Sequence, residues 1–312
     1  MSFIRKVNNS IQKRCERLFF HSLTRISPEL NTRVNFKMRF GCSIDLKNPK
    51  TFNEKISWLK LYAYSNSEQA IMCSDKYLVR KYVEECGCSE ILNDLYYSWD
   101  DPEEINWSEL PSSFVLKWNF GMGANIICTD KSKLNEHEVK RQLAKWRKNN
   151  FWLNFAEMHY SRIQPKIICE KYLNDGTGKL PVDYKVYCFN GIPKFVCVCR
   201  EREKGKTKYQ YYNKEGEVLF LSDSSSKDSL LGIDKERLYD IFAYSEKLCK
   251  NIPFCRADFY IIGTQIIFGE LTFTPCAGLD NDFTKEADIK LGELLDISGV
   301  QRTEMIVRSA NK

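Results

Sequence analysis

The sequence predicts an α+β protein whose sheets are mostly antiparallel, with helices between them. Short apolar runs are joined by hairpin turns such as Asn190-Gly191 and Gly263-Thr264. Longer stretches carry apolar residues at three- and four-residue spacing, which is typical of helices. The chain has 312 residues, 43% of them hydrophobic, which is enough for one large domain or for two to three lobes with cores of their own.

The first predicted element is a basic amphipathic helix over residues 3–24, in a segment that we take as 1–30. Its apolar positions recur at helical spacing: Ile4, Val7, Ile11, Cys15, Leu18, Phe19 and Leu23. The first fifty residues hold eleven Lys and Arg against three acids, a net charge of +8, whereas the whole chain has +6. The helix either lies on an anionic membrane surface or docks on the body of the protein or on a partner.

Residues 31–100 predict a helical N-terminal region. In "TFNEKISWLKLY", Thr51 or Asn53 is positioned to cap a helix. The stretch "SDKYLVRKYVEECG" predicts a second helix, which Gly87 ends.

Short strands begin at about residue 112, and residues 101–172 predict a first lobe. "SFVLKW" and "NIICT" read as strands on either side of a loop that contains Gly121 and Gly123. A helix follows at about 135–149, and "PKIICEKYL" reads as a further strand.

Residues 173–312 predict a second lobe built from hairpins. "VDYKVYCFNGIPKFVCVCR" turns at its Asn-Gly pair, and "KYQYYNKEGEVLF" turns at "NKEG". The polar stretch "SDSSSKDS" predicts a loop, a helix is expected at about 234–250, and "RADFYIIGTQIIFGEL" closes the lobe as a hairpin.

The 13 cysteines indicate reduced thiols in the core, because several lie inside apolar strands, such as Cys188, Cys197 and Cys199. The sequence has no paired C-x-x-C motifs of the kind that zinc sites use. It also shows neither a secretory signal pattern nor an apolar run near the ~20 residues that span a bilayer. We therefore expect a cytoplasmic protein.

The loop in "LKWNFGMGANII" is the first candidate binding feature. Gly121 and Gly123 would let backbone N–H groups approach phosphate oxygens, and Lys117 would add a positive charge. The motif lacks a third glycine and a following helix, so it is neither a Walker loop nor a Rossmann turn. Taken alone, it is equally an ordinary hairpin turn.

Two further strands carry polar residues that have either a purely structural role or a functional one. Glu170, Lys171, Tyr172 and Leu173 end a strand and would offer backbone groups and an apolar wall to a flat ring, or simply form an edge strand. Asp183 and Lys185 share one strand face, where a weak surface salt bridge is the alternative.

The closing hairpin carries the most suggestive polar set. Arg256 and Asp258 share one strand face, Glu270 and Thr272 share a face of the next strand, and the two acids are expected opposite each other. Two carboxylates so close repel each other unless a cation such as Mg²⁺ neutralises them. The alternative is the solvated side of a half-buried sheet.

The order of these weak signals resembles the ATP-grasp superfamily over roughly residues 70–280. Lys76 in "SDKYLVRKY" comes first, followed by Lys117 with its glycine loop, "EKYL", "DYK" and "R-A-D … E-x-T". The stretches "FNEKISWLKLY", "DYKVYCFNG" and "FGELTFTP" resemble the TupA-like branch, found in bacterial surface-polysaccharide gene sets, from about residue 35 to the C-terminus. The resemblance implies two α+β lobes that clasp ATP, with a smaller N-terminal helical region.

The resemblance also implies roles for particular residues. Lys76 and Lys117 match lysines that contact ATP phosphates, and Gly121, Met122 and Gly123 match a lid loop over those phosphates. Glu170 to Leu173 match the adenine and ribose hinge, and Asp183 and Lys185 complete the nucleotide and catalytic set. Asp258 and Glu270 match acids that bind two Mg²⁺ ions, and Arg256 matches an arginine that stabilises the reacting acyl group. Thr272 stands where many relatives have Asn, which leaves its role as a metal ligand open.

The function that the resemblance implies is ATP-dependent carboxylate–amine ligation through an acyl phosphate. Its substrates would be a sugar acid or amino acid and an amine, joined during synthesis of a capsule, O-antigen or other surface polysaccharide, with no nucleic acid involved. A glycosyltransferase of the same pathway is one alternative, although the sequence lacks an Asp-x-Asp motif. A degenerate ATP-grasp body that acts as a binding or scaffold module is the other. Residues 3–24 would attach the protein to a partner or to the inner face of the cell membrane.

Overall fold

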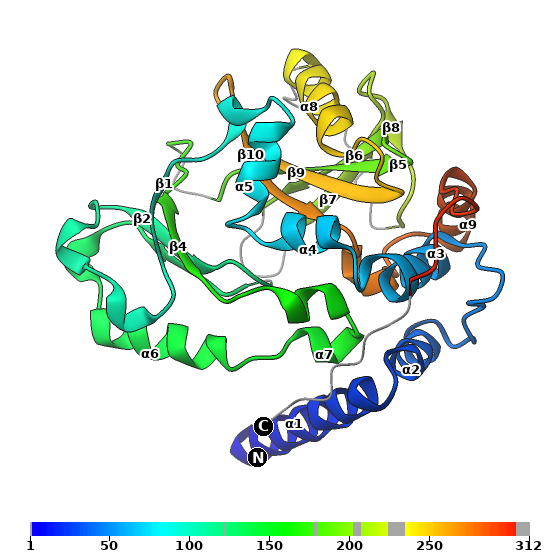
Figure 1. Ribbon diagram of the computed structural model, residues 1–312, viewed down its shortest axis with the longest axis horizontal. Coiled ribbons are helices and arrows are strands. Elements are labelled where there is room, and N and C mark those ends of the chain that lie inside the picture. Colours follow the sequence, from blue (N-terminus) through cyan, green and yellow to red (C-terminus); the bar gives the residue numbers. More distant parts are fainter. Residues whose placement is uncertain (1, 122, 177–179, 202–206, 224–234, 304–312) are drawn as a thin grey trace.

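The computed structural model describes residues 2–121, 123–176, 180–201, 207–223 and 235–303, with side chains from residue 12 onward. Within these ranges the chain forms two antiparallel sheets with helices around them (Figure 1). The predicted α+β class is confirmed.

The smaller sheet has four strands in the order β1-β4-β2-β3. They are β1 (Leu95–Trp99), β2 (Phe114–Trp118), β3 (Asn125–Cys128) and β4 (Ile167–Lys171). Helix α6 (Glu136–Arg147) runs along this sheet (Figure 1) and buries Val139 and Leu143 in its core. Both strands predicted beside the glycine loop, and the strand that contains Glu170, are confirmed.

The larger sheet has six strands in the order β10-β9-β5-β6-β7-β8. They are β5 (Asp183–Phe189), β6 (Ile192–Arg200), β7 (Lys208–Tyr212), β8 (Val218–Leu219), β9 (Phe254–Ile262) and β10 (Gln265–Thr272). The three predicted hairpins are confirmed, and Asn190 and Gly191 both adopt positive φ, as a tight hairpin turn with an Asn-Gly pair requires. Cys188, Cys197 and Cys199 are buried free thiols, as expected.

The remaining helices form two groups: one packs on the larger sheet, and the other consists of the two N-terminal helices and a short helix that contacts them. They are α1 (Ser2–Ile26), α2 (Pro28–Phe40), α3 (Phe52–Leu59), the π-helical turn η1 (Lys60–Tyr64), α4 (Glu68–Ser74), α5 (Val79–Glu85), α7 (Trp152–Phe155), α8 (Lys235–Leu248) and α9 (Lys285–Leu294). The largest apolar cluster packs residues of α3, α4, α5, α8 and α9 against the larger sheet. Of the loop predicted from "SDSSSKDS", residues 224–229 lie outside the described residues.

The helix predicted over "SDKYLVRKYVEECG" begins later than expected. The Asp75 carboxylate accepts hydrogen bonds from the backbone N–H groups of Tyr77 and Leu78, which forms a turn between α4 and α5. The helix therefore starts at Val79, and Lys76 lies in the turn. The cap of α3 is Thr51, which forms a reciprocal capping box with Glu54.

Strand β1 was missed in the sequence, and it lies in the stretch expected to be helical. It has five residues, "LYYSW", and pairs with β4 at the edge of the smaller sheet. A strand so short, with aromatic residues on both faces, lacks the alternation that identifies a half-buried strand. The segment before residue 100 therefore contributes to the same sheet as residues 114–171.

The predicted N-terminal helix is confirmed as α1, and its last turns dock on the body. Phe20 is buried, and the Thr24 hydroxyl donates to the carbonyl of Leu153 at 2.6 Å. Leu18 and Phe19 are each 54% exposed, and residues 12–17 are exposed as well. Only the C-terminal part of the helix therefore packs on the protein among the residues whose side chains are described.

Candidate active site

A cavity of about 520 Å³ lies where the two sheets face each other. The smaller sheet contributes Val115, Lys117, Asn125, Ile127 and Glu170, and the larger sheet contributes the charged residues of β5, β9 and β10. Most of the sequence-predicted site residues line it: Lys76, Lys117, Gly121, Gly123, Glu170, Lys171, Tyr172, Leu173, Asp183, Lys185, Arg256, Asp258 and Glu270. Met122 lies outside the described residues, and Thr272 is not among the lining residues.

A bulge at Gly269 brings Asp258 and Glu270 opposite each other. The Gly263-Thr264 turn pairs Ile262 with Gln265, and an unbroken ladder from that pair would set Asp258 opposite Gly269. The register shifts between Phe268 and Glu270, so Asp258 pairs with Glu270 instead. The expectation that the two acids face each other is confirmed, and the bulge that achieves it was not anticipated.

Glycine is required at this bulge by a close backbone approach. A Cβ on residue 269 would lie 3.0 Å from the backbone carbonyl oxygen of Asp258. Successive side chains along a strand point to opposite faces of the sheet. The extra residue in the bulge therefore places Glu270 on the face that Asp258 occupies.

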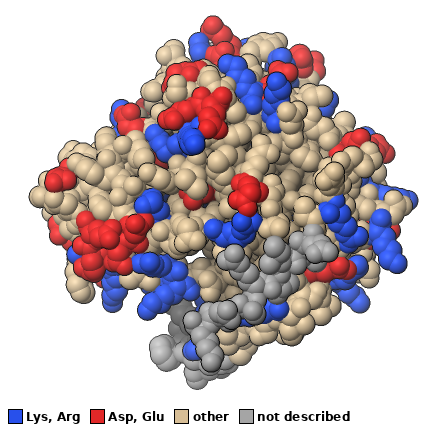
Figure 2. Space-filling model, viewed as in Figure 1, with Lys and Arg blue, Asp and Glu red and all other residues tan. Residues whose placement is uncertain are grey.

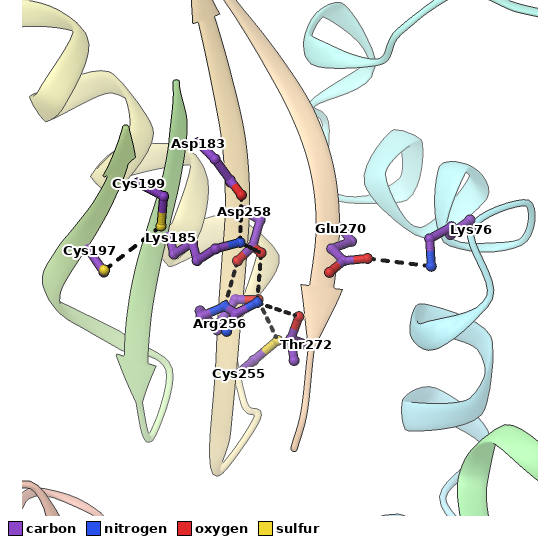
Figure 3. Close-up of polar contacts among 10 residues, drawn as sticks. All are labelled: Lys76, Asp183, Lys185, Cys197, Cys199, Cys255, Arg256, Asp258, Glu270 and Thr272. Atoms are coloured by element: carbon purple, nitrogen blue, oxygen red, sulfur yellow. Dashed lines mark hydrogen bonds and ion pairs between the residues drawn. The ribbon is translucent and has the colours of Figure 1, made fainter. Parts of the chain in front are cut away.

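Asp258 is the centre of a charged network on β5 and β9 (Figure 3). Its carboxylate accepts from Nζ of Lys185 at 2.6 Å and from Nε and Nη2 of Arg256 at 2.7 and 2.8 Å. Lys185 also contacts Asp183 at 2.7 Å. Burial works against the charge on Lys185, but the attraction of Asp258 and Asp183 outweighs it and raises the pKa of this lysine.

Glu270 lies on the same face of the sheet, but its carboxylate is directed away from this network, toward Lys76 in the turn before α5 (Figure 3). Its Oε2 lies 3.4 Å from Nζ of Lys76. Burial favours the neutral acid, but Lys76, Lys185, Arg256 and Lys117 together lower the pKa of Glu270 to about 2. Glu270 is therefore an ionised carboxylate at neutral pH.

Lys76 ties this carboxylate to the glycine loop. Its Nζ donates to the carbonyl of Gly121 at 2.8 Å, and its backbone N–H donates to the carbonyl of Asn119. Gly121 has a φ of +74°, and a Cβ there would lie 2.8 Å from the ring of Phe151. The loop that the sequence singled out is thus fixed at its first glycine beside the cavity.

Lys117 and Glu170 form the charged pair of the smaller sheet. Their side chains meet at 2.7 Å across β2 and β4. Burial opposes the charge on Lys117, and the attraction of Glu170 outweighs it, so the pKa of the lysine is raised. The neighbouring wall is apolar, formed by Val115, Ile127, Leu173, Leu180 and Pro181.

Thr272 faces Arg256 rather than an open ligand position. Its Oγ1 accepts from Nη2 of Arg256 at 3.2 Å. The sequence did not indicate a further part of the cavity wall, which is lined by Tyr187, Tyr209, Tyr211, Cys276, Asp280 and Asp282. The signal was present in "FTPCAGLDND", which places two acids directly after the predicted metal strand.

The oxygen ligands present suit a magnesium ion held jointly with phosphate. Mg²⁺ in nucleotide sites takes one or two carboxylates and completes its shell with phosphate oxygens and water. Glu270 is ionised and engaged by one lysine at 3.4 Å, whereas both oxygens of Asp258 accept from Lys185 and Arg256. In the described part of the chain, no group of three or more His, Cys, Asp or Glu side chains is placed to hold a metal by itself.

On the face shown in Figure 2, acidic and basic side chains are interspersed. None of the described helices combines the length and the apolar character that a membrane crossing requires.

Comparison with solved structures found ligases that are similar to part of this chain at low sequence identity. A D-alanine–D-alanine ligase from Bacillus anthracis is 16% identical over 71% of this chain and 63% of its own, with a TM-score of 0.42. A D-alanine–D-alanine ligase from Helicobacter pylori is 12% identical over 79% and 67%, with a TM-score of 0.43. The ATP-grasp ligase PsnB in complex with a minimal precursor is 11% identical over 67% and 55%, with a TM-score of 0.37.

The chain thus spans 63% of the length of the first of these ligases and 55% of PsnB. No curated protein is similar enough in sequence to match. The family model described as TupA-like ATPgrasp matches residues 54–296, which is most of the chain. This protein belongs to the TupA-like ATP-grasp family.

Proposed function

We propose that this protein is an ATP-dependent carboxylate–amine ligase. Membership of an ATP-grasp family supports an ATP-dependent ligase at the level of the fold. The observation that carries the proposal is the cavity between the two sheets, where Lys76 and Lys117 lie beside the glycine loop and Glu270 lies 3.4 Å from Lys76. Lysines beside a glycine loop suit phosphate oxygens, and a carboxylate next to them suits the Mg²⁺ that accompanies a nucleotide.

Within this proposal, ATP lies along the smaller sheet. Tyr172, Leu173 and the apolar wall would enclose adenine, and the backbone at Glu170 and Lys171 would meet its edge. Lys76 and Lys117 would contact the phosphates beneath the loop at Gly121 and Gly123. Glu270 would hold Mg²⁺, with phosphate oxygens and water as the other ligands, and the bound ion would neutralise charge on the transferring phosphoryl oxygens. Asp258 and Thr272, which the sequence also suggested as ligands, are engaged by Arg256.

The chemistry would proceed in two steps. A substrate carboxylate attacks the γ-phosphorus of ATP, the bond to the ADP oxygen breaks, and an acyl phosphate forms. The amine, once it has lost its ammonium proton, attacks the acyl carbon; the C–N bond forms, the C–O bond to phosphate breaks, and phosphate leaves with a proton from the amine. Arg256, fixed by Asp258, would stabilise the negative charge that develops on the acyl oxygen when the amine adds, and Lys185 would stabilise the negative charge on the acyl phosphate.

The substrates would be a sugar acid or an amino acid and an amine, joined during synthesis of a bacterial surface polysaccharide such as a capsule or O-antigen. This part of the proposal extends the family resemblance and rests on no contact in the cavity. Measuring ADP release with pairs of uronic acids, amino acids and amines tests it. Release that requires both an acid and an amine supports ligation, whereas release with neither, or with a nucleotide sugar alone, would contradict it.

We further propose that the protein works in the cytoplasm at the inner face of the membrane. The exposed part of α1 carries Lys13, Arg14 and Arg17 beside Leu18 and Phe19, the pattern of a helix that binds anionic lipid. Co-sedimentation with phosphatidylglycerol vesicles but not with phosphatidylcholine vesicles is expected. Leu18→Glu with Phe19→Glu should remove it; sedimentation unaffected by the two changes would exclude this helix as the contact.

A further inference from the structure

One part of the cavity differs in composition from the part that we propose binds phosphate, at Lys76, Lys117 and the glycine loop. We call it the acceptor pocket; it is lined by Tyr187, Tyr209, Tyr211, Cys276, Asp280 and Asp282. The tyrosines come from β5 and β7, and the other three residues belong to the loop after β10. Aromatic rings beside carboxylates are the side chains that bind organic cations.

The acceptor pocket adjoins the proposed reaction centre. The Arg256 guanidinium carbon lies 6.0 Å from the centroid of the Tyr187 ring. Asp280 is also within electrostatic reach of Arg256: burial raises the pKa of Asp280, and the guanidinium works in the opposite direction. A group held by Asp280 would therefore lie next to the arginine that is proposed to face the acyl carbon.

Asp280 differs from the acids on the two sheets because it has no basic side chain as a partner among the described residues. Glu170 pairs with Lys117, Asp183 and Asp258 pair with Lys185, and Glu270 pairs with Lys76. Asp280 is 8% exposed, and it forms no salt bridge with any described residue. Its carboxyl group accepts from the backbone N–H of Asp282 at 3.0 Å and from the Cys276 thiol.

A buried carboxylate without a cation is costly, so a counter-charge supplied by a ligand would be favourable. An anionic ligand would be repelled by Asp280 and Asp282. A neutral ligand would leave Asp280 as buried and uncompensated as before.

The loop that carries Asp280 is held from the other side by one helical face. Asn53, Ser57 and Lys60, spaced as i, i+4 and i+7, lie on that face. Asn53 pairs with both backbone groups of Asp280, donating to its carbonyl at 2.9 Å and accepting from its N–H at 2.7 Å. Ser57 and Lys60 donate to the carbonyls of Gly278 and Ala277.

This support fixes a conformation that the loop would not keep alone. Cys276, Ala277 and Gly278 all have φ values in the left-handed region, at 48°, 57° and 76°. Two such residues that are not glycine persist only where the surroundings hold them. The hydrogen bonds use backbone groups of the loop, so the Asp280 carboxylate stays directed to the cavity.

We propose that the acceptor pocket binds the amine co-substrate through its primary ammonium group, with Asp280 as the counter-charge and the three tyrosines as walls. This inference rests on the proposed ligase function and adds the charge class of the acceptor to it. It makes Asp280 the specificity-determining residue and Asn53 a positioning residue.

Binding measured by NMR titration tests the pocket without requiring turnover. The probes are glucosamine, ethanolamine and L-lysine, each compared with its N-acetylated counterpart, with and without ATP. The full-length protein is expected to bind at least one free amine about tenfold more tightly than its acetylated form, as a charge-assisted hydrogen bond would give. Asp280→Asn, which keeps shape and hydrogen bonding, should abolish that preference, and the exposed change Glu293→Gln should not.

The outcomes separate this inference from the proposed function. If ATP binds but no free amine is preferred, or if the preference survives Asp280→Asn, the acceptor pocket is wrong and the ATP site stands. If an amine preference that depends on Asp280 appears without any ATP binding, the pocket is supported and the ligase is contradicted. Asn53→Ala should weaken amine binding while ATP affinity stays within about twofold, because it frees the backbone of Asp280; an equal loss of both would indicate general unfolding.

Discussion

At the scale of single residues, the two opposed carboxylates of the cavity have different surroundings. Asp258 accepts hydrogen bonds from Lys185 and Arg256 and holds both cations in place. Glu270 has one lysine at 3.4 Å, and its side chain is 34% exposed. We therefore expect Glu270 to bind the metal ion. We expect Asp258 to stabilise the fold and to position Lys185 and Arg256 in the site.

Substitution of the two acids should separate these roles. Glu270→Gln should lower Mg²⁺-dependent ADP release about a hundredfold with little change in the melting temperature, because a neutral amide neutralises no cation. Asp258→Asn should lower ADP release too, and it should also destabilise the protein by about 3–5 kcal/mol, since it leaves the buried Arg256 without its anion and Lys185 with Asp183 alone.

Glu293→Gln is the matched control, because Glu293 is exposed and lies outside the cavity. Full ADP release by the Glu270 variant would contradict the metal site. Equal melting temperatures for the two variants would contradict the structural role of Asp258.

The burial of His159 predicts that the stability of the fold depends on pH, independently of catalysis. Both ring nitrogens are buried without a hydrogen-bond partner, and burial, with the charge of Lys60, lowers the pKa of this histidine to about 3. The unfolded chain takes up the proton near pH 6.5 and the folded one does not, so stability is lost as the pH falls from 6.5 toward 3.

The His159→Phe variant should therefore lose less stability on acidification than the wild type. The difference approaches about 1.4 kcal/mol per pH unit between the two pKa values. Urea unfolding at a series of pH values measures it. Parallel curves for the two proteins would show that His159 does not titrate as described. The neighbouring titratable groups Glu157 and Lys60 are present in both proteins, so their contribution to the pH dependence cancels in the comparison.

Most residues of the part of the cavity that we propose binds phosphate were predictable, because each charged residue lies in a strand or loop whose pattern is visible in the sequence. The acid Asp280 is visible in "FTPCAGLDND", but its position in the cavity was not predictable. Its placement depends on Asn53, 227 positions away in the chain, whose amide pairs with the Asp280 backbone. The sequence showed Asn53 only as a candidate helix cap, a role that Thr51 has instead.

At the scale of elements, the β-bulge in the closing hairpin decides which side chains share the cavity. Gly269→Ala should destabilise the protein by about 1–3 kcal/mol, since the new Cβ would lie 3.0 Å from a backbone carbonyl that cannot easily move. ADP release should fall as well, because relief of that contact shifts Glu270 relative to Asp258.

Gly299→Ala is the control for this change, because a Cβ there meets nothing within 4 Å. Denaturant unfolding and ADP release are measured on both variants. Equal values for the two would show that the bulge tolerates a side chain and does not position Glu270.

Helix α1 provides a second prediction at this scale. Deletion of residues 1–17 should leave the melting temperature unchanged, because the described residues from 12 to 17 are exposed. Deletion of residues 1–25 also removes Phe20 and Thr24 from their contacts, and it should cost about 2 kcal/mol or more. Circular dichroism melts of both truncations measure this, and equal melting temperatures would contradict the docking of the last turns.

The element boundaries show where sequence patterns lose their information. The helix over residues 3–24 and the hairpins with Asn-Gly and Gly-Thr turns follow from periodicity and turn chemistry. The turn at Asp75 and the bulge at Gly269 do not, because each depends on a local hydrogen bond or a close approach that leaves the apolar pattern unchanged. A register derived from the turn alone would have separated the two acids.

At the scale of the whole molecule, function depends on how the two sheets face each other. The sequence predicted the α+β class and, through the family resemblance, two lobes that clasp a nucleotide. It did not show that β1, from the N-terminal region, completes the smaller sheet. Pairing between strands about seventy residues apart is a long-range property that propensity and spacing do not encode.

The central claim is that Mg-ATP binds between the two sheets, against Lys117. Isothermal titration calorimetry of the full-length protein with ATP and Mg²⁺ tests it most directly, with the exposed change Lys148→Met as the control. One site per chain is expected, and Lys117→Met should weaken binding at least tenfold while the variant stays folded by circular dichroism. Absence of binding to the wild type, or equal affinity in the Lys117 variant and the control, would contradict the account.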